Sequence, residues 1–182
     1  METIQKHLSQ VGEGMSLLDQ EQIAMAVLSL RIVRKNMGTV YVMGNGGSHA
    51  TASHFANDLI KMGKVRAVCL GDAVSVMTAY GNDDGWDNMY SNPLRKHLKP
   101  GDGVVGISCS GNSENVVRAL RQVSEIETVL SIGLTGLSRA SEICKIGLGV
   151  LVHAPVPDMR VQEDLHLMIC HAIARSLQEG EE

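Results

Sequence analysis

Histidines and carboxylates on two segments of expected helix are the side chains most able to carry chemistry. His54 and Asp58 are four residues apart, so a helix places both on one face, one turn apart. Near the other end of the chain, Asp164 and His171 are seven residues apart and share a face. Imidazole and carboxylate ligands suit a zinc ion that keeps an open position. If the two helices meet, they can build a four-ligand metal site.

The C-terminal helix offers further candidates in the run "VQEDLHLMICHAI", residues 161–173. Glu163 is eight residues from His171 and is offset from it around the helix axis by roughly 80°. His166 points to another side, and Gln162 lies nearly opposite His171. A histidine four residues from an aspartate is more often a surface pair or a satisfied core histidine. Because spacing alone does not show that the two helices meet, the metal site is a hypothesis about tertiary structure.

Two short glycine-bearing stretches predict a site for a phosphate group. "GNGGS" (44–48) and "SCSGNS" (108–113) each follow an expected strand and precede an expected helix. Glycine lets the backbone approach a ligand closely. A helix N-terminus offers unpaired N–H groups and a partial positive charge. With serine hydroxyls as further donors, these parts bind phosphate without lysine or arginine.

The two stretches differ in how specific they are. "GNGGS" alone also fits a tight turn with Ser48 as the N-cap, and it lacks the spacing of the Walker and dinucleotide-binding motifs. "SCSGNS" has three serines around one glycine, which is more than a helix cap requires. The phosphate prediction therefore depends mainly on residues 108–113.

Short apolar runs that alternate with helical stretches must position these side chains. The expected strands are 39–43, 66–70, 103–107, 128–134 and 149–153. The expected helices begin near Ser48, Ala73, Trp86, Asn112, Ser138 and Met159. This order predicts one doubly wound α/β domain with a parallel sheet covered on both faces. Ligands of such sheets bind beyond the carboxyl ends of the strands, where both glycine-bearing stretches lie.

The segment before the first strand, residues 2–36, has apolar residues at helical spacing, and Gly12 and Gly14 are expected to mark a break in it. It covers no obvious sheet face, so residues 1–37 are interpreted as a helix that packs on another subunit. The α/β core is expected over 38–178. The acidic tail, 179–182, is expected to be disordered.

Composition excludes several classes of protein. The chain has 182 residues, which fits one domain, and its formal net charge of −4 with no basic cluster argues against a nucleic-acid surface. No apolar run approaches the roughly 20 residues of a membrane helix, and no signal peptide is predicted. The four cysteines are not paired as CxxC, so free thiols in a reducing cytoplasm are expected.

Four motifs occur in the order seen in sugar-isomerase (SIS) domains: "GNGGSHATASHFANDL", "TAYGNDDGWDNMYSNPL", "GDGVVGISCSGNSENVVRAL" and "EDLHLMICHAI". Nearly the whole chain resembles the phosphoheptose isomerase family, which interconverts sedoheptulose 7-phosphate and D-glycero-D-manno-heptose 7-phosphate for nucleotide-activated heptose biosynthesis. The resemblance implies a flavodoxin-like sheet of five strands. It also implies a homotetramer with active sites at subunit contacts and, in many members, one zinc ion per site.

The resemblance also implies roles for individual residues, matched by motif. Those that contact the substrate are Asn45, Gly46, Gly47, Ser48, Asn82 and Asp83, with Ser108, Cys109, Ser110 and Ser113 on the phosphate. Those at the positions of the metal ligands are His54, Asp58, Glu163 and His171. Moving a proton between C1 and C2 requires a base and an acid. Asp58 is the expected base with Glu163 as its rival, and His171 is the expected acid or metal ligand.

Three positions depart from the family pattern. The family usually has Glu at Asp58, Gln at Glu163 unless Gln162 takes that place through a one-residue slip, and Thr at Cys109. We interpret an anionic Glu163 as compensation for the shorter Asp58, in metal affinity or in base work. Two alternatives stay open: a non-catalytic module that binds a phosphosugar or a partner protein, and an isomerase of a shorter sugar phosphate.

Overall fold

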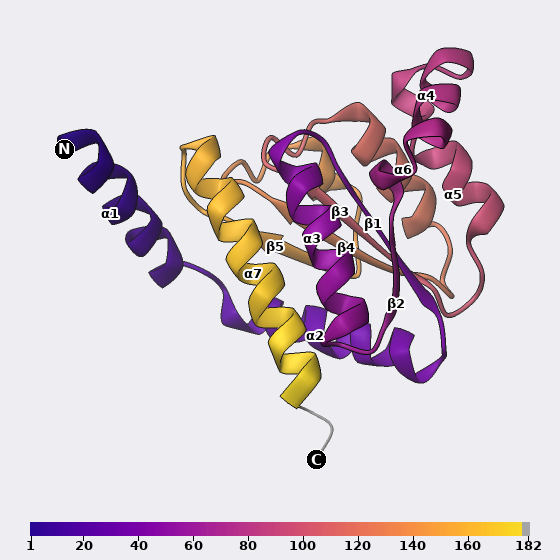
Figure 1. The fold of residues 1–182 in the computed structure, drawn as a ribbon, viewed down its shortest axis with the longest axis horizontal. Helices are drawn as coiled ribbons and strands as arrows, with labels where there is room; N and C mark the ends of the chain where they lie inside the picture. Colours follow the sequence, from indigo (N-terminus) through magenta and orange to yellow (C-terminus); the bar gives the residue numbers. More distant parts are fainter. Residues whose placement is uncertain (180–182) are drawn as a thin grey trace.

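A computed structural model of the chain, which describes residues 1–179, contains one parallel sheet with helices on both faces (Figure 1). Its strands are β1 (Thr39–Gly44), β2 (Arg66–Cys69), β3 (Gly103–Ser108), β4 (Leu130–Thr135) and β5 (Val150–His153). Their order in the sheet is β2-β1-β3-β4-β5, which is the flavodoxin-like doubly wound order. The predicted fold class is confirmed, and each expected strand agrees with an observed one to within two residues.

The described chain also contains seven α-helices and three short 3₁₀ turns. The helices are α1 (Glu2–Ser16), α2 (Gln20–Lys35), α3 (Gly47–Lys61), α4 (Val74–Asp83), α5 (Ser91–His97), α6 (Glu114–Ser124) and α7 (Met159–Glu179). The 3₁₀ turns are η1 (Leu70–Asp72), η2 (Trp86–Asn88) and η3 (Glu142–Lys145). Within the part of the chain that is described, no helix combines the length and the apolar character that crossing a bilayer requires. Residues 180–182 of the expected tail lie outside the described residues.

Alternate residues of β1 and β3 are buried on opposite faces of the sheet, as a period of two requires. Val105 and Ile107 of β3 pack with α2, α3 and α7, whereas Val104 packs with α5 and α6 on the other face. Gly44 at the end of β1 pairs with Ile107 near the end of β3. The chain that follows β1 and the chain that follows β3 therefore leave the sheet side by side and turn to opposite faces.

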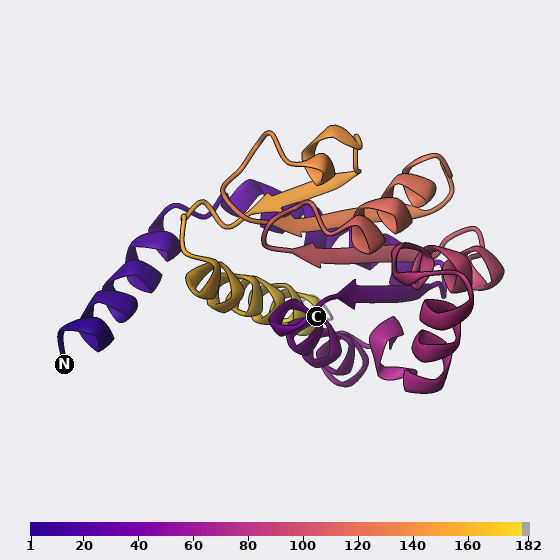
Figure 2. The same ribbon diagram turned by 90° about the horizontal axis from the view of Figure 1, so that it is seen from above.

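The N-terminal segment differs from the expectation in two ways. First, the break falls between α1 and α2 at residues 17–19, not at the glycines. Gly14 lies inside α1 where that helix crosses α7, and a Cβ at Gly14 would come within 2.8 Å of the Leu165 side chain. Second, α2 covers the sheet, with Leu30 and Val33 almost fully buried. In contrast, α1 projects away from the sheet (Figures 1 and 2).

The helix expected from Ser138 is also absent; the described chain has only the 3₁₀ turn η3 there. This segment instead makes hydrogen bonds to residues 108–113, called the serine loop below, which follow β3. The N–H of Ile143 donates to the carbonyl of Gly111 at 2.9 Å, and the N–H of Glu142 donates to Oδ1 of Asn112 at 2.9 Å. Non-local hydrogen bonds of this kind leave no periodic pattern in a sequence.

Asp19 begins α2 as its N-cap, and its Oδ1 accepts the N–H groups of Glu21 and Gln22 at 3.0 and 3.1 Å. Replacing Asp19 by Ala removes this acceptor, so we expect the free energy of unfolding to fall by about 1 kcal/mol. Urea denaturation, monitored by circular dichroism, measures this free energy of unfolding. Asp19→Asn keeps an acceptor oxygen and serves as the control. Equal stability of the two variants would contradict the capping role.

Candidate active site

A pocket of about 290 Å³ lies at the carboxyl ends of β1 and β3. Every substrate-binding residue predicted from the two glycine-bearing stretches lines it, together with residues from β3 and the start of α7. The lining consists of Asn45, Gly46, Gly47, Ser48, Ile107, Ser108, Cys109, Ser110, Ser113, Met159 and Glu163. The two stretches meet because β1 and β3 are neighbours in the sheet although β2 separates them in the chain.

Two helix N-termini face this pocket without a side chain capping either one. Gly46 is the N-cap of α3, with φ of +56°, and has no side chain to accept the first N–H groups. Ser113 is the N-cap of α6, but its hydroxyl makes no capping bond and instead accepts from the Ser108 hydroxyl at 3.2 Å. Unpaired N–H groups and two helix dipoles therefore converge with serine hydroxyls, an arrangement that binds an anion.

The serine loop is shaped by a left-handed glycine. Gly111 has φ of +64°, and its N–H donates to Ser108 Oγ at 3.2 Å. A Cβ at Gly111 would collide with the Ser141 and Thr135 hydroxyls, so the loop passes close to β4 and η3. Glycine is required here both for the conformation and for the close approach.

Asn115 joins the two loops, and we did not predict it from the sequence. It is almost fully buried in α6 and exchanges two hydrogen bonds with Asn45: Asn45 Nδ2 donates to Asn115 Oδ1 at 2.9 Å, and Asn115 Nδ2 donates to Asn45 Oδ1 at 3.0 Å. Tyr90 donates its hydroxyl to the carbonyl of Gly44 at 2.6 Å, and burial raises the pKa of Tyr90 to about 12. Nothing in the local sequence "SGNSENVV" (110–117) marks Asn115 as a link between the loops.

Helices α3 and α7 pack side by side on one face of the sheet (Figure 1), and this contact brings His54, Asp58 and His171 together. The Nε2 atoms of the two histidines are 3.2 Å apart. Asp58 Oδ2 is 3.4 Å from His54 Nε2 and 3.8 Å from His171 Nε2. The Asp58 side chain is only 10% exposed, whereas both histidine side chains are 50% exposed. Two imidazoles and one carboxylate at these distances form a donor set that fits a divalent metal such as zinc.

Glu163, the fourth expected ligand, does not belong to this cluster. Its carboxylate lies against Gly47, in the space that a Cβ at that position would occupy, and so it lines the pocket. Gln162 faces the other way and donates from Nε2 to the Val156 carbonyl at 2.6 Å. Asp164 is paired with His7 of α1 at 2.9 Å. The structure therefore places Glu163, and not its neighbours, beside the anion pocket.

A neutral cysteine–histidine pair lies beneath the pocket. His166 is fully buried, with Nε2 at 3.1 Å from the Thr135 carbonyl and Nδ1 at 3.7 Å from Cys109 Sγ. Because a carbonyl only accepts, Nε2 carries the proton and Nδ1 accepts from the thiol. Burial lowers the pKa of His166 to about 4 and raises the pKa of Cys109 to about 11, so Cys109 acts as a hydrogen-bond donor and not as a thiolate.

Comparison with known proteins identifies the family of the chain. Residues 4–136 match the family described as the SIS domain. The chain is 36% identical over 181 residues to the phosphoheptose isomerase of Geotalea daltonii, which covers 96% of this chain and 90% of that protein. The chain belongs to the phosphoheptose isomerase family. A second family member, from Bordetella avium, is 34% identical over 95% of this chain and 93% of its own length.

A solved phosphoheptose isomerase structure, from Neisseria gonorrhoeae, superposes with a TM-score of 0.87 at 31% identity and covers 98% of this chain and 96% of that one. The match includes the N-terminal helices as well as the α/β core. Membership of the phosphoheptose isomerase family thus rests on both sequence and fold.

Asn82 and Asp83 are the predicted substrate contacts that this chain does not bring to its own pocket. Both are exposed at the end of α4, where Asn82 Nδ2 donates to Asp83 Oδ1 at 2.7 Å. The described residues that line the pocket include neither of them.

Replacing Gly111 by Ala tests the shape of the serine loop. We expect strain of about 1–2 kcal/mol from the left-handed backbone and about 1–3 kcal/mol more from the clash with two buried hydroxyls. Affinity for inorganic phosphate should fall as the loop moves. Gly147→Ala is the matched control, since Gly147 has φ of +72° but open space around it. Urea denaturation and phosphate titration measure both variants, and equal losses in the two would refute the close approach.

Proposed function

We propose that this chain is an aldose–ketose isomerase that interconverts sedoheptulose 7-phosphate and D-glycero-D-manno-heptose 7-phosphate. One observation carries the proposal: an anion pocket at the start of α3 and α7 lies on the same pair of helices as the histidine–carboxylate cluster. Ser48 in the pocket and His54 in the cluster are separated by about 9 Å along α3, at 1.5 Å per residue. An extended sugar phosphate has a comparable length, so one substrate can reach both parts of the site, and the heptose is assigned from the phosphoheptose isomerases that the chain resembles.

The reaction moves one proton between C2 and C1 through an enediol(ate). Asp58, the buried carboxylate of the cluster, takes the proton from C2 of the aldose and returns it to C1. His171, half exposed and adjacent, gives a proton to O1 and receives one from O2. The sugar must bind with C2 about 3 Å from the Asp58 carboxylate. The pocket residues orient the substrate by its phosphate, which keeps the reacting end at the cluster.

His54, Asp58 and His171 would hold a zinc ion, since their donor atoms all lie within 4.8 Å of one another. When bound, the ion would polarise the sugar oxygens and stabilise developing negative charge. Glu163 is assigned to the substrate side of the site because its carboxylate lies against Gly47. It is the rival base to Asp58.

Asp58→Asn keeps the shape of the side chain and removes its basicity. We expect turnover of sedoheptulose 7-phosphate to fall by at least about 100-fold, while the affinity for the phosphosugar changes little. Asp164→Asn is the control, because this carboxylate lies on the same helix as Glu163 but pairs with His7. Aldose formation, followed with and without added zinc, is the measurement.

The outcomes separate the candidate roles. Full turnover in Asp58→Asn together with its loss in Glu163→Gln would transfer the base role to Glu163. If the unmodified chain binds sedoheptulose 7-phosphate tightly and forms no aldose with or without zinc, the isomerase proposal fails and the regulatory alternative takes its place.

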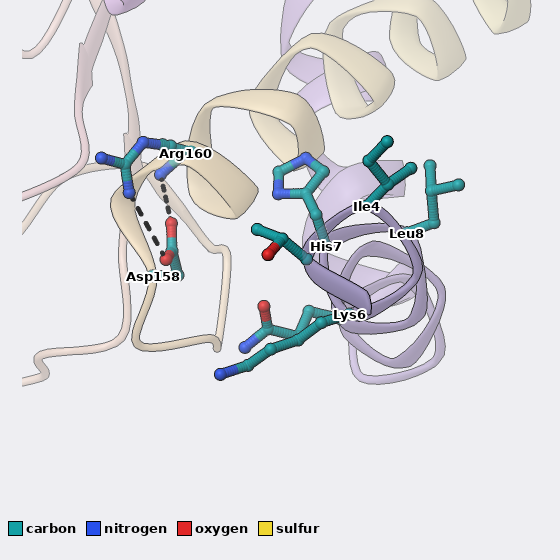
Figure 3. Close-up of a pocket in the computed structure, with 8 residues that line it drawn as sticks. Ile4, Lys6, His7, Leu8, Asp158 and Arg160 are labelled. Carbon is teal, nitrogen blue, oxygen red and sulfur yellow. Dashed lines mark hydrogen bonds and ion pairs between the residues drawn. The ribbon is translucent and has the colours of Figure 1, made fainter. Parts of the chain in front are cut away.

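We further infer that the active form is a homotetramer in the cytoplasm, assembled through α1. Ile4, Leu8 and Met15 form an exposed apolar stripe on α1 at helical spacing. A groove of about 600 Å³ separates α1 from the start of α7, with Ile4, His7 and Leu8 on one side and Asp158 and Arg160 on the other (Figure 3). A second chain would cover these apolar side chains, and the exposed Asn82 and Asp83 of a neighbour would complete each pocket. The four free cysteines agree with a reducing compartment.

Leu8→Lys places a charge on this stripe and should split the oligomer into smaller species. Ser9→Lys, which adds the same charge on another side of α1, should leave the oligomer intact. Light scattering coupled to gel filtration gives the mass of each. An unchanged mass for Leu8→Lys would exclude this face of α1 from the interface.

A further inference from the structure

A second cluster of metal-ligating side chains lies on another face of α3. It consists of His49 in the first turn of α3, Cys69 at the end of β2 and Asp72 in η1. One ligand atom from each residue lies within 4.8 Å of the other two. His49 precedes His54 by five residues, which turns it about 140° away around the helix axis. None of the three residues belongs to the proposed isomerase machinery.

The distances fit an ion between the sulfur and the imidazole. Cys69 Sγ is 3.6 Å from His49 Nδ1. Two ligands on one tetrahedral zinc, with Zn–S and Zn–N bonds of about 2.3 and 2.05 Å, stand roughly 3.5 Å apart. Asp72 Oδ1 is 3.4 Å from His49 Nε2, which is longer than an ordinary N–H···O hydrogen bond. One ligand atom of Asp72 lies within 4.8 Å of one from His49 and one from Cys69, so the carboxylate stands close to an ion bound by the sulfur and the imidazole.

The surroundings of the cluster are those of a built site. Ser53, one turn along α3 from His49, donates its hydroxyl to Asp72 Oδ2 at 2.8 Å and leaves Oδ1 for a ligand bond. Gly71 lets the turn pass beside the imidazole, since a Cβ there would come within 2.5 Å of His49 Nδ1. Hydrogen bonds to a ligating carboxylate and a fixed imidazole orientation are the features that support metal ligands.

Access and chemistry point to the same class of ion. Cys69 is only 5% exposed, whereas the His49 and Asp72 side chains are 34% and 51% exposed. An ion can therefore enter from solvent, bind the buried Cys69 sulfur and keep a water molecule as its fourth ligand. Sulfur and nitrogen ligands select borderline-soft metals such as zinc over magnesium or calcium.

We propose that His49, Cys69 and Asp72 bind a zinc-type divalent cation, separately from the cluster on α3 and α7. His49 and Gly71 also line a cavity of about 220 Å³ whose wall includes Asn45 and Gly46 of the anion pocket. An ion at this position ties η1, and with it the start of α4, to α3. The ion therefore stabilises the wall of the anion pocket that Asn45 and Gly46 form.

Cobalt(II) distinguishes the two clusters on the full-length chain, because a thiolate ligand adds a sulfur-to-cobalt absorption band in the near ultraviolet and a site of nitrogen and oxygen ligands does not. We expect the unmodified chain to show this band on saturation with cobalt. Cys69→Ser should abolish the band, and Cys144→Ser, a change in a cysteine outside the cluster, should keep it. His54→Ala should also keep the band, so loss of the isomerase metal is read separately from loss of this site.

Two further variants probe the same site without altering the buried sulfur. Asp72→Asn should weaken cobalt binding by about tenfold or more, and Ser53→Ala by about tenfold, since supporting partners contribute on that scale. Circular dichroism of each metal-free variant confirms its fold. The proposal is overturned if saturated unmodified chain lacks the band, if Cys69→Ser retains it, or if folded Asp72→Asn binds cobalt as tightly as the unmodified chain.

Discussion

The packing of α3 against α7 is the contact on which the rest of the site depends. Phe55 and Leu59 of α3 and Ile169 and Ile173 of α7 are nearly or fully buried in one cluster against the sheet. This apolar contact sets the rotation of both helices about their axes. The same rotation that buries the apolar side chains brings the imidazole of His171 toward α3, where His54 and Asp58 form the adjacent edge of the helix. The packing that buries the apolar faces of α3 and α7 therefore also sets the geometry of the histidine–carboxylate cluster.

The anion pocket relies on backbone N–H groups and hydroxyls that the sheet positions, and not on basic side chains. β1 and β3 are neighbours whose following helices turn to opposite faces, so two uncapped helix N-termini open into one crevice. The reciprocal amide pair of Asn45 and Asn115 holds the two loops at a fixed separation without adding charge. Neutral donors of this kind attract an anion through many weak partial charges and not through one strong ion pair.

Two carboxylates, Asp58 of α3 and Glu163 of α7, lie in different parts of the site. Asp58 lies beside the two histidines, whereas Glu163 lies at the other end of the site, beside Gly47. The separation gives each carboxylate a distinct neighbourhood, one facing two imidazoles and the other facing the anion pocket.

The sequence by itself determined the strands, the sheet class and the two glycine-bearing loops that follow β1 and β3, because short apolar runs and the turn chemistry of glycine and serine are local properties. It also placed His54 and Asp58 on one face, since that follows from helix geometry alone. Only the tertiary structure decided that α2 covers the sheet, that residues 138–149 form no α-helix, that Asn115 joins the loops, and that Glu163 faces the pocket instead of the histidines. These outcomes depend on which elements meet and at what rotation. That is settled by packing between segments distant in the chain, which no local pattern records.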